Sequence, residues 1–257
     1  MKVTIVQPDL SWENPDANFQ HLSSLIEDSL PGSDLIVLPE MFSTGFSMNS
    51  EKLAETMNGP GVRWMRDLAS SSDCAVAGSL IILDKEKNYN RFVFALPDGE
   101  IYTYDKRHLF MMERENKFFT PGDRRVVVDY KGFKINLQIC YDLRFPVWSR
   151  LQDLDYDAMI YIASWPEARR DVWNKLLIAR AIENQCFVIG VNRIGKDGEG
   201  ISYSGDSVII GPKGEMILET EEYKECVASA ELSIDDLVNF RNKFPVWEDS
   251  DSFSLDS

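Results

Sequence analysis

Cys140 is the residue of this chain whose surroundings most clearly favour covalent chemistry. It follows the strand-like run 133–139 and is followed at once by the polar segment 141–144. A strand that ends in a sharp turn before a helix exposes such a thiol at the carboxyl edge of a sheet, where open α/β folds bind their ligands. The chain has only two histidines, His21 and His108. The sequence therefore favours a carboxylate or an amine as the group that activates this thiol.

Two further polar residues, Glu40 and Lys106, also follow strand-like segments. Glu40 comes directly after 35–39, and Lys106 follows 100–104. If these strand ends converge with that of Cys140, the carboxylate can accept the thiol proton while sulfur attacks a carbonyl or nitrile carbon. The ammonium can then stabilise the oxyanion, and the loss of one such donor typically costs about 10²–10³ in rate. This trio predicts acyl transfer without histidine.

Each of these residues also has a simpler role that spacing alone leaves open. A lone cysteine after a strand is more often a small core residue. Glu40 follows a proline and could lie in a surface turn, while Lys106 precedes an arginine and could belong to a solvated basic patch. His108 is the competing base, but a structural hydrogen bond is its simpler role, and we rank it below Glu40. The other cysteines lie in apolar segments and are expected in the core: Cys74, Cys186 and Cys226.

The composition limits the class of partner. Of 257 residues 44% are apolar and 27% charged, which is ordinary for a globular protein. Lys and Arg number 27 against 42 Asp and Glu, giving a net charge of −15 that repels nucleic-acid phosphates and anionic membranes. We expect residues 1–8 to form a strand rather than a signal peptide, and no apolar run approaches the ~20 residues of a membrane span. The cysteines form no C-x-x-C pair, so we expect a cytoplasmic protein without a metal or disulfide.

Apolar strands alternate with helical patterns along the whole chain. Helices are predicted at 15–26, 62–71, after 145 and at 169–185. Strands are predicted at 3–7, 34–39, 74–83, 91–96, 100–104, 126–128, 133–140, 158–163, 187–192, 207–210 and 215–218. The mixture of β-α-β units and hairpins predicts an α/β (α+β) fold with mixed sheets covered by helices. We expect one domain over 1–248 and a loosely held, Ser- and Asp-rich acidic tail over 249–257.

Three segments together resemble the nitrilase (carbon–nitrogen hydrolase) superfamily: Leu38–Phe42, Tyr104–Leu109 and Ile139–Phe145. Glu, Lys and Cys occur in the order of that family, 66 and 34 residues apart. Further segments resemble its YafV-type omega-amidases, namely 42–46, 140–148, 164–169, 179–185 and 243–247. The resemblance implies a four-layer α-β-β-α sandwich, usually paired about a two-fold axis as a homodimer. It also implies hydrolysis of the terminal amide of 2-oxoglutaramate and similar 2-oxo acid amides to the 2-oxo acid and ammonia, without metal or cofactor.

The same resemblance suggests roles for individual residues. It makes Glu40 the general base, Lys106 the oxyanion stabiliser and Cys140 the nucleophile. Glu115 matches a second glutamate that orients the lysine or the substrate amide, although a surface carboxylate is its simpler role. Candidates for the second oxyanion donor and for substrate binding are the Tyr141 N–H, Arg144 and Trp165. For Arg144, pairing with Asp142 or with a helix end is an equally good interpretation.

Two alternatives to this function stay open at this point. The same chemistry could act on another small amide, a carbamoyl compound, deaminated glutathione or a nitrile. A non-catalytic scaffold with this fold is less favoured, because Glu40, Lys106 and Cys140 are all present.

Overall fold

Two six-stranded sheets organise this protein in the computed structural model, which describes residues 1–27 and 32–255. The first sheet has the order β14-β1-β2-β3-β4-β5, and the second has the order β13-β12-β9-β8-β7-β6. The strands of the first are β1 (Lys2–Gln7), β2 (Leu35–Val37), β3 (Ala75–Asp84), β4 (Lys87–Ala95), β5 (Ile101–Asp105) and β14 (Cys226–Glu231). Those of the second are β6 (Val127–Tyr130), β7 (Phe133–Ile139), β8 (Ala158–Ala163), β9 (Phe187–Asn192), β12 (Val208–Ile210) and β13 (Met216–Glu219). A small ribbon joins β10 (Ile194–Lys196) to β11 (Ser202–Ser204).

Both sheets are mixed. In the first, β1, β2 and β3 are parallel, whereas β4, β5 and β14 pair antiparallel with their neighbours. In the second, β7, β8 and β9 are parallel, and antiparallel strands complete both edges. This arrangement confirms the predicted mixed-sheet fold.

The two sheets pack face to face through alternate residues of their strands. Side chains alternate between the two faces of a strand, so one set from each sheet can enter a shared core. Val3, Phe92 and Phe94 of the first sheet belong to the same buried cluster as Leu137 and Ile160 of the second. Every one of these side chains is fully buried.

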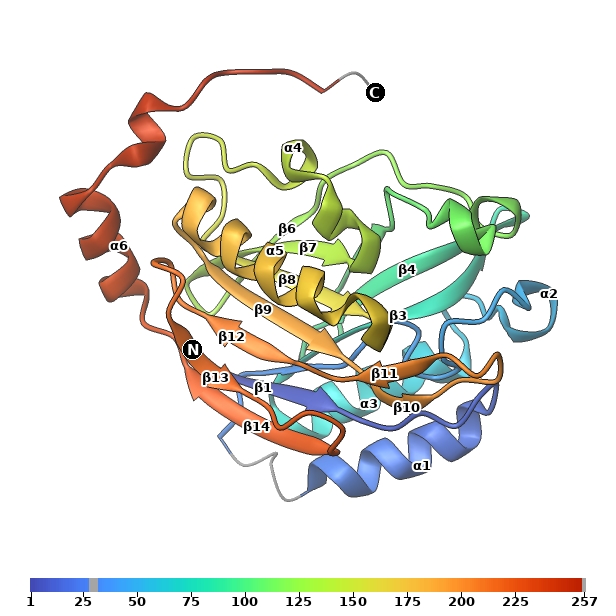
Figure 1. The fold of residues 1–257 in the computed structure, drawn as a ribbon. Helices are drawn as coiled ribbons and strands as arrows, with labels where there is room; N and C mark the ends of the chain where they lie inside the picture. Colours follow the sequence, from blue (N-terminus) through green and yellow to red (C-terminus); the bar gives the residue numbers. More distant parts are fainter. Residues whose placement is uncertain (28–31, 256–257) are drawn as a thin grey trace.

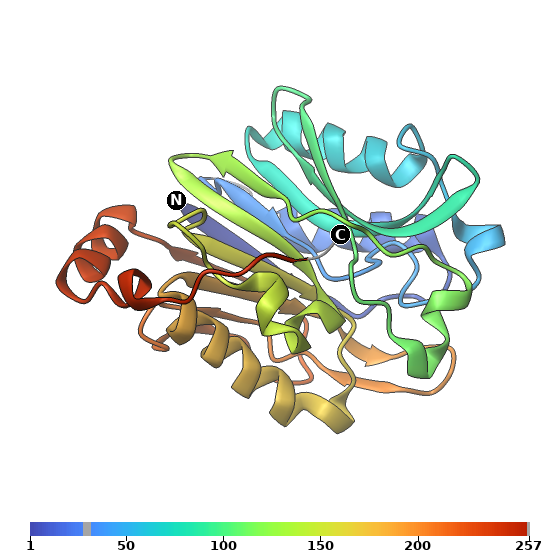
Figure 2. The same cartoon turned by 90° about the horizontal axis from the view of Figure 1, so that it is seen from above.

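Helices cover the outer face of each sheet. α1 (Pro15–Ile26) begins with proline in its first turn and with an Asn14 cap, and α3 (Pro60–Ser72) buries Val62, Met65 and Ala69 along one stripe. α5 (Arg170–Asn184) covers the second sheet with Trp173, Leu177 and Ala181. Figure 2 shows the resulting four layers, with α3 and α5 on opposite sides of the paired sheets. The predicted α-β-β-α sandwich is confirmed.

The remaining elements are short or near the carboxyl end of the chain. They are α2 (Ser50–Leu53), α4 (Pro146–Ser149), α6 (Ile234–Lys243), and the 3-10 helices η2 (Met111–Glu113), η3 (Glu115–Lys117), η4 (Cys140–Arg144), η5 (Glu167–Arg169) and η6 (Val246–Asp249). The helix expected after residue 145 is the single turn α4. β14 and α6 were not predicted, because the edge strand is half-exposed and lacks a long apolar run.

Several strands end at the same edge of the sandwich, and this edge positions the candidate site. β2, β5, β7, β8 and β9 all run toward it, as the arrows of β7 and β9 show in Figure 1. Glu40, Lys106 and Cys140 follow three of these strands.

Residues 250–255 have no helix or strand, and 256–257 of the predicted tail lie outside the described residues; the domain boundary at 248 stays a prediction. Over the described ranges 1–27 and 32–255, no helix is long and apolar enough to cross a bilayer.

Candidate active site

Cys140 lies at the first position of η4, where β7 ends, and its backbone is strained. Its φ is +43°, in the left-handed region that residues other than glycine rarely adopt. Such a conformation typically costs about 1–3 kcal/mol and persists only where surrounding contacts enforce it. The residue is 9% exposed, and it contributes to the wall of a cavity. The sharp turn expected after this strand is therefore present.

Asp142 holds this turn in place. Its Oδ2 accepts hydrogen bonds from the Ile139 N–H (3.0 Å) and from the Tyr104 hydroxyl (2.7 Å). Its Oδ1 accepts the His108 N–H (2.9 Å) and lies 2.8 Å from His108 Nδ1. The His108 ring also stacks on Phe145, with ring centroids 3.8 Å apart. His108 thus has the structural hydrogen bond that we judged its simpler role.

Glu40 is fully buried three residues beyond the end of β2. Its Oε1 accepts hydrogen bonds from Lys106 Nζ (2.9 Å) and Asn90 Nδ2 (2.8 Å). Its Oε2 accepts the Ser164 N–H at 2.8 Å. The surface-turn interpretation of Glu40 is wrong, because the chain beyond Pro39 enters the protein instead of leaving it.

Lys106 is buried between two carboxylates. Its Nζ lies 3.0 and 2.9 Å from the two carboxyl oxygens of Glu115, in addition to its contact with Glu40. Glu115 is fully buried and also accepts the Phe110 N–H at 2.5 Å. Lys106 Nζ lies 5.1 Å from the ring centroid of Phe46. The solvated-patch interpretation of Lys106 and the surface interpretation of Glu115 are both wrong.

The electrostatics of this array follow from burial and from opposite charge. Burial pulls the pKa of Lys106 down, but the charges of Glu115 and Glu40 outweigh it and leave this pKa raised. Burial raises the pKa of Glu115, while Lys106 opposes that rise. Burial, and next to it the charge of Glu40, raise the pKa of the Cys140 thiol well above its ordinary value, against the lowering effect of Lys106. At neutral pH the resting site therefore holds a protonated thiol and a charged ammonium.

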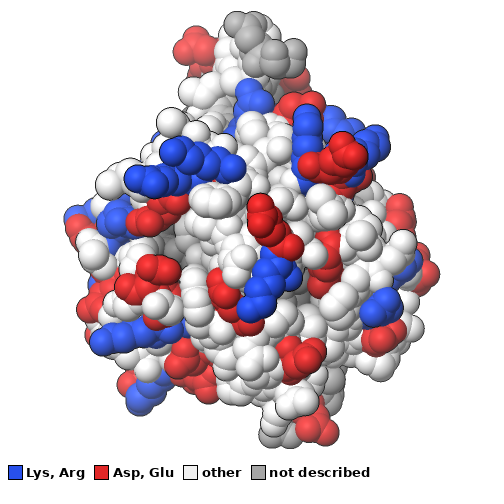
Figure 3. All heavy atoms as spheres, turned by 90° about the vertical axis from the view of Figure 1, so that its right-hand side faces the viewer, with Lys and Arg blue, Asp and Glu red and all other residues white. Residues whose placement is uncertain are grey.

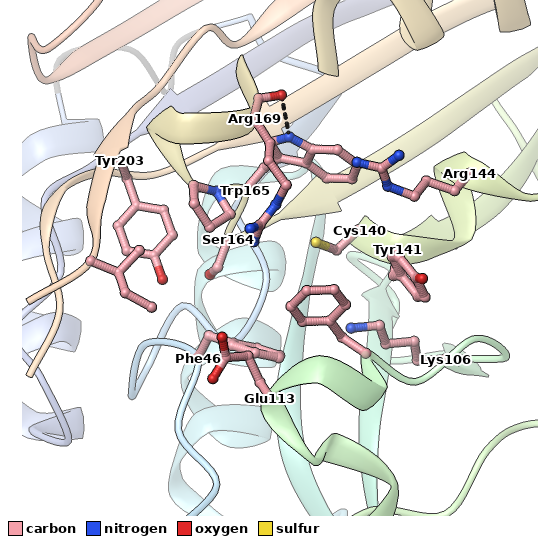
Figure 4. A pocket seen from close by; sticks show the side chains of 13 residues that line it. Phe46, Lys106, Glu113, Cys140, Tyr141, Arg144, Ser164, Trp165, Arg169 and Tyr203 are labelled. Atoms are coloured by element: carbon pink, nitrogen blue, oxygen red, sulfur yellow. Dashed lines mark hydrogen bonds between the residues drawn. The ribbon is translucent and has the colours of Figure 1, made fainter. Parts of the chain in front are cut away.

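A cavity with about 460 Å³ of empty space, partly open to solvent, lies above Cys140. Figure 4 shows Lys106, Tyr141, Arg144 and Trp165 around the same cavity as the Cys140 sulfur. Its complete lining is Phe46, Lys106, Phe110, Glu113, Cys140, Tyr141, Arg144, Ser164, Trp165, Pro166, Arg169, Ile201 and Tyr203.

The predicted substrate-binding residues Tyr141, Arg144 and Trp165 all follow Cys140 in sequence and line this cavity with it. The Arg144 guanidinium lies over the Trp165 ring, 5.2 Å from its centroid. Asp142 instead bonds Tyr104, His108 and Ile139, so the alternative pairing of Arg144 with Asp142 is not observed. The strand edge points toward the face seen in Figure 3, where basic and acidic side chains lie side by side and no broad basic surface forms.

Of the four cysteines, all of which lie within the described residues, Cys140 lines this cavity. Cys74 and Cys186 are fully buried, as expected for core residues. Cys226 is only half-buried, because it begins the edge strand β14, and its assignment to the core was wrong. In the part of the chain that the structure describes, no cluster of three His, Cys, Asp or Glu side chains could hold a metal ion.

Sequence reasoning missed two polar groups that position Glu40. Asn90 donates to Glu40 and also approaches Glu115 at 3.3 Å, while Ser164 donates both its N–H and its hydroxyl to Glu40. Asn90 had a detectable signal: it is in phase with the inward-facing Phe92 and Phe94 along β4, and a polar residue in that register requires a buried partner. Ser164 follows β8 as Cys140 follows β7, which is a weaker signal.

Comparisons with known proteins agree with this geometry. The carbon–nitrogen hydrolase family model matches residues 2–242. "Omega-amidase YafV" of Escherichia coli (strain K12) is 42% identical over 255 residues, which cover 99% of this chain and 98% of that protein. "2-oxoglutaramate amidase" of Bacillus subtilis (strain 168) is 34% identical over 255 residues, which cover 97% of this chain and 98% of that protein.

A solved structure gives the same result. The crystal structure of XC1258 from Xanthomonas campestris, a CN-hydrolase superfamily protein with an arsenic adduct in its active site, has a TM-score of 0.97 at 40% identity. The match covers 100% of this chain and 99% of that one. The resemblance inferred from the three segments is thereby confirmed, and the chain belongs to the carbon–nitrogen hydrolase family of amide-hydrolysing enzymes.

Proposed function

We propose that this enzyme is an omega-amidase that hydrolyses the terminal amide of 2-oxoglutaramate, and of similar 2-oxo acid amides, to the 2-oxo acid and ammonia. The observation that carries this proposal is the buried Glu40–Lys106–Glu115 array beside the Cys140 thiol, at a cavity that also presents Arg144. The relatives named for omega-amidase and 2-oxoglutaramate amidase activity, which match over almost the whole chain, support the choice of substrate.

In the acylation half of the proposed reaction, the Cys140 sulfur attacks the amide carbon and Glu40 accepts the thiol proton. Glu40 lies close enough that its charge helps to raise the pKa of the thiol, and this raised pKa means that attack requires such a base. Lys106 then stabilises the oxyanion together with the Tyr141 N–H. Lys106 has three protons, so one proton shared between the Glu115 oxygens and one for Glu40 leave the third for the oxyanion.

The carbon–nitrogen bond then breaks, and Glu40 returns its proton to the departing nitrogen to release ammonia. A thioester remains on Cys140. Glu40 next takes a proton from water, the oxygen attacks the thioester carbon, and the sulfur departs and recovers the proton. Glu115 does not transfer a proton in this scheme; it holds the Lys106 ammonium in place.

The substrate carboxylate is proposed to bind the Arg144 guanidinium. This guanidinium makes a cation–π contact with the Trp165 ring and lines the cavity. The protein as a whole carries a net charge of −15, so an anionic substrate needs such a local cation. Trp165 is itself fixed by a backbone N–H donated to Asn192 Oδ1 at 2.8 Å and by an indole N–H donated to the Arg169 carbonyl at 2.8 Å.

A turnover comparison tests the proposed function. Ammonia release is measured with 2-oxoglutaramate, glutamine, asparagine and deaminated glutathione, for the wild type and for Cys140→Ala. We expect the highest kcat/KM with 2-oxoglutaramate and no release by the variant, whose fold is checked by circular dichroism. A higher kcat/KM for one of the other amides would refute the substrate, and turnover by Cys140→Ala would refute the nucleophile.

A homodimer is proposed from the family resemblance, and a cytoplasmic location from the wide spacing of the cysteines. Sedimentation equilibrium of the purified protein distinguishes a dimer from the 29.4 kDa monomer. A monomer at micromolar concentration would contradict the dimer.

A further inference from the structure

Arg169 is a second arginine in the cavity, and the proposed mechanism does not use it. It ends η5, directly before α5, and it lines the same cavity as Cys140 and Arg144. Its guanidinium lies 5.2 Å from the ring centroid of Phe110. Figure 4 shows both arginines among the side chains around the Cys140 sulfur, Arg144 from η4 and Arg169 from the segment that follows β8.

The position of Arg169 is fixed from two directions. Its carbonyl accepts the Trp165 indole N–H, drawn as a dashed line in Figure 4. Phe110 beneath its guanidinium is held by the hydrogen bond from its N–H to Glu115 and by edge-to-face packing on Tyr141, with centroids 5.0 Å apart. The Phe110 ring thus belongs to a segment that is hydrogen-bonded to Glu115, which in turn binds the buried Lys106 ammonium. A guanidinium seated on a fixed aromatic ring loses little freedom when it binds an anion.

Neither cavity arginine has an ion-pair partner within residues 1–27 and 32–255, whereas seven of the twelve other arginines of this acidic protein do. Glu113 is a carboxylate that lines the same cavity and could pair with these arginines. It is exposed, however, and also lines a neighbouring hollow. Water therefore screens its charge more than that of the half-buried arginines. The cavity thus carries more positive charge than one substrate carboxylate neutralises.

We propose that Arg169 is a specificity-determining residue that makes this site select 2-oxo acid amides over 2-amino acid amides. This inference rests on the proposed function and concerns the same cavity. One guanidinium binds the substrate carboxylate, and the second then faces the substituent on the adjacent carbon. An oxo group accepts a hydrogen bond from it, whereas the ammonium of glutamine is repelled by it. The two arginines thus select the substrate by attraction and reject its amino analogue by repulsion between like charges.

The test compares three amides that share a carboxylate and a chain length and differ only at carbon 2: 2-oxoglutaramate, glutaramate and glutamine. The kcat/KM of each is measured for the wild type, Arg169→Met, Arg169→Lys and the control Arg124→Met. Methionine keeps an unbranched apolar chain on the Phe110 ring, so the variant should fold. Arg124 is 86% exposed in its side chain and lies outside the cavity, so its replacement removes the same charge from the protein without touching the site.

For Arg169→Met we expect kcat/KM on 2-oxoglutaramate to fall about 10- to 100-fold, the usual effect of losing a hydrogen bond from a charged donor. Glutaramate should lose less and glutamine least, so the preference for the oxo over the amino substrate shrinks at least about 10-fold. Arg169→Lys keeps the charge and should retain rejection of glutamine while losing part of the oxo preference. Arg124→Met should match the wild type.

An equal loss on all three amides would overturn the proposal, because it would show a structural role for Arg169. An unchanged preference would overturn it as well. If the wild type does not prefer 2-oxoglutaramate, the proposed function fails, but the ratio of glutaramate to glutamine still tests the repulsion. Should turnover of Arg169→Met be too slow to measure, calorimetric titration of 2-oxoglutarate into Cys140→Ala, with and without Arg169→Met, decides the matter. Binding that is weakened less than threefold would refute the assignment.

Discussion

Asp142→Asn is the substitution whose consequences can be worked out most directly from the hydrogen bonds. Each carboxylate oxygen of Asp142 accepts one backbone N–H: Oδ1 from His108 and Oδ2 from Ile139. Asparagine has one accepting oxygen and an NH₂ group that can only donate. Whichever way the amide is turned, its NH₂ faces a backbone N–H. Because backbone donors cannot reverse their direction, rotation of the side chain cannot remove this conflict.

The magnitude follows from this count. One buried N–H left unsatisfied costs about 1–3 kcal/mol, and loss of the negative charge weakens the remaining bonds by about 1 kcal/mol in total. The free energy of unfolding should therefore fall by about 2–4 kcal/mol, which a protein of ordinary stability survives. This loss is comparable to the strain of about 1–3 kcal/mol in a residue with the backbone conformation of Cys140. Without its anchor the turn can relax, and a shift of about 1 Å in the nucleophile can cost about 10²-fold in kcat.

The assay combines urea denaturation, followed by tryptophan fluorescence, with kcat and KM for 2-oxoglutaramate. Asp171→Asn is the matched control, because Asp171 is exposed on α5 and pairs with Lys175 on the surface. We expect the control to change the unfolding free energy by less than about 0.5 kcal/mol. If Asp142→Asn unfolds at the same urea concentration as the wild type and keeps its kcat, the argument that Asp142 enforces the Cys140 turn is refuted.

Three other perturbations test separate parts of the structure. Glu40→Gln cannot carry a proton and should lower kcat about 10²–10⁴-fold in both half-reactions, so a rapid burst of acyl-enzyme would count against its role as base. In Gly122→Ala, the new Cβ would lie 2.1 Å from the Asp105 carbonyl, beside the Gly122 N–H bond to the Lys106 carbonyl. We expect a loss of about 1–3 kcal/mol in urea denaturation together with a lower kcat, and a variant that matched the wild type in both would contradict the close approach. Burial raises the pKa of Cys186 above its ordinary 9.0, so above pH 9 the unfolded chain loses a proton that the folded chain keeps, and stability falls as pH rises. Cys186→Ala should reduce that fall between pH 9 and 11 by up to about 1.4 kcal/mol per pH unit; equal slopes in urea titrations would exclude this contribution.

The positions of the three central residues could be predicted because each depends on local sequence. An apolar run that stops at a polar residue marks the end of a strand, and Glu40, Lys106 and Cys140 all follow such runs. Parallel strands in one sheet end at the same edge, so the convergence of such residues could be anticipated. Glu115 follows no strand, and only the family resemblance suggested its role.

The contacts that support these residues could not be predicted in the same way. Asn90 and Ser164 reach Glu40 across 50 and 124 residues of sequence, and no periodic pattern encodes such a pairing. Asp142 and Arg144 are two positions apart, yet the turn directs one into four hydrogen bonds and the other over Trp165. Edge elements such as β14 and α6 were missed because their burial depends on where neighbouring strands lie.

The sequence by itself determined the order of helices α1, α3 and α5 and of every strand except β10, β11 and β14. It also determined the strand-end placement of the thiol, the carboxylate and the ammonium, and the family. Only the tertiary structure decided that Lys106 lies between two carboxylates and that two arginines of the cavity above them have no ion-pair partner among residues 1–27 and 32–255. The physical reason is that the interaction of charges depends on their distances and on the exclusion of water around them. Both quantities are set by packing between the two sheets, which local sequence patterns do not contain.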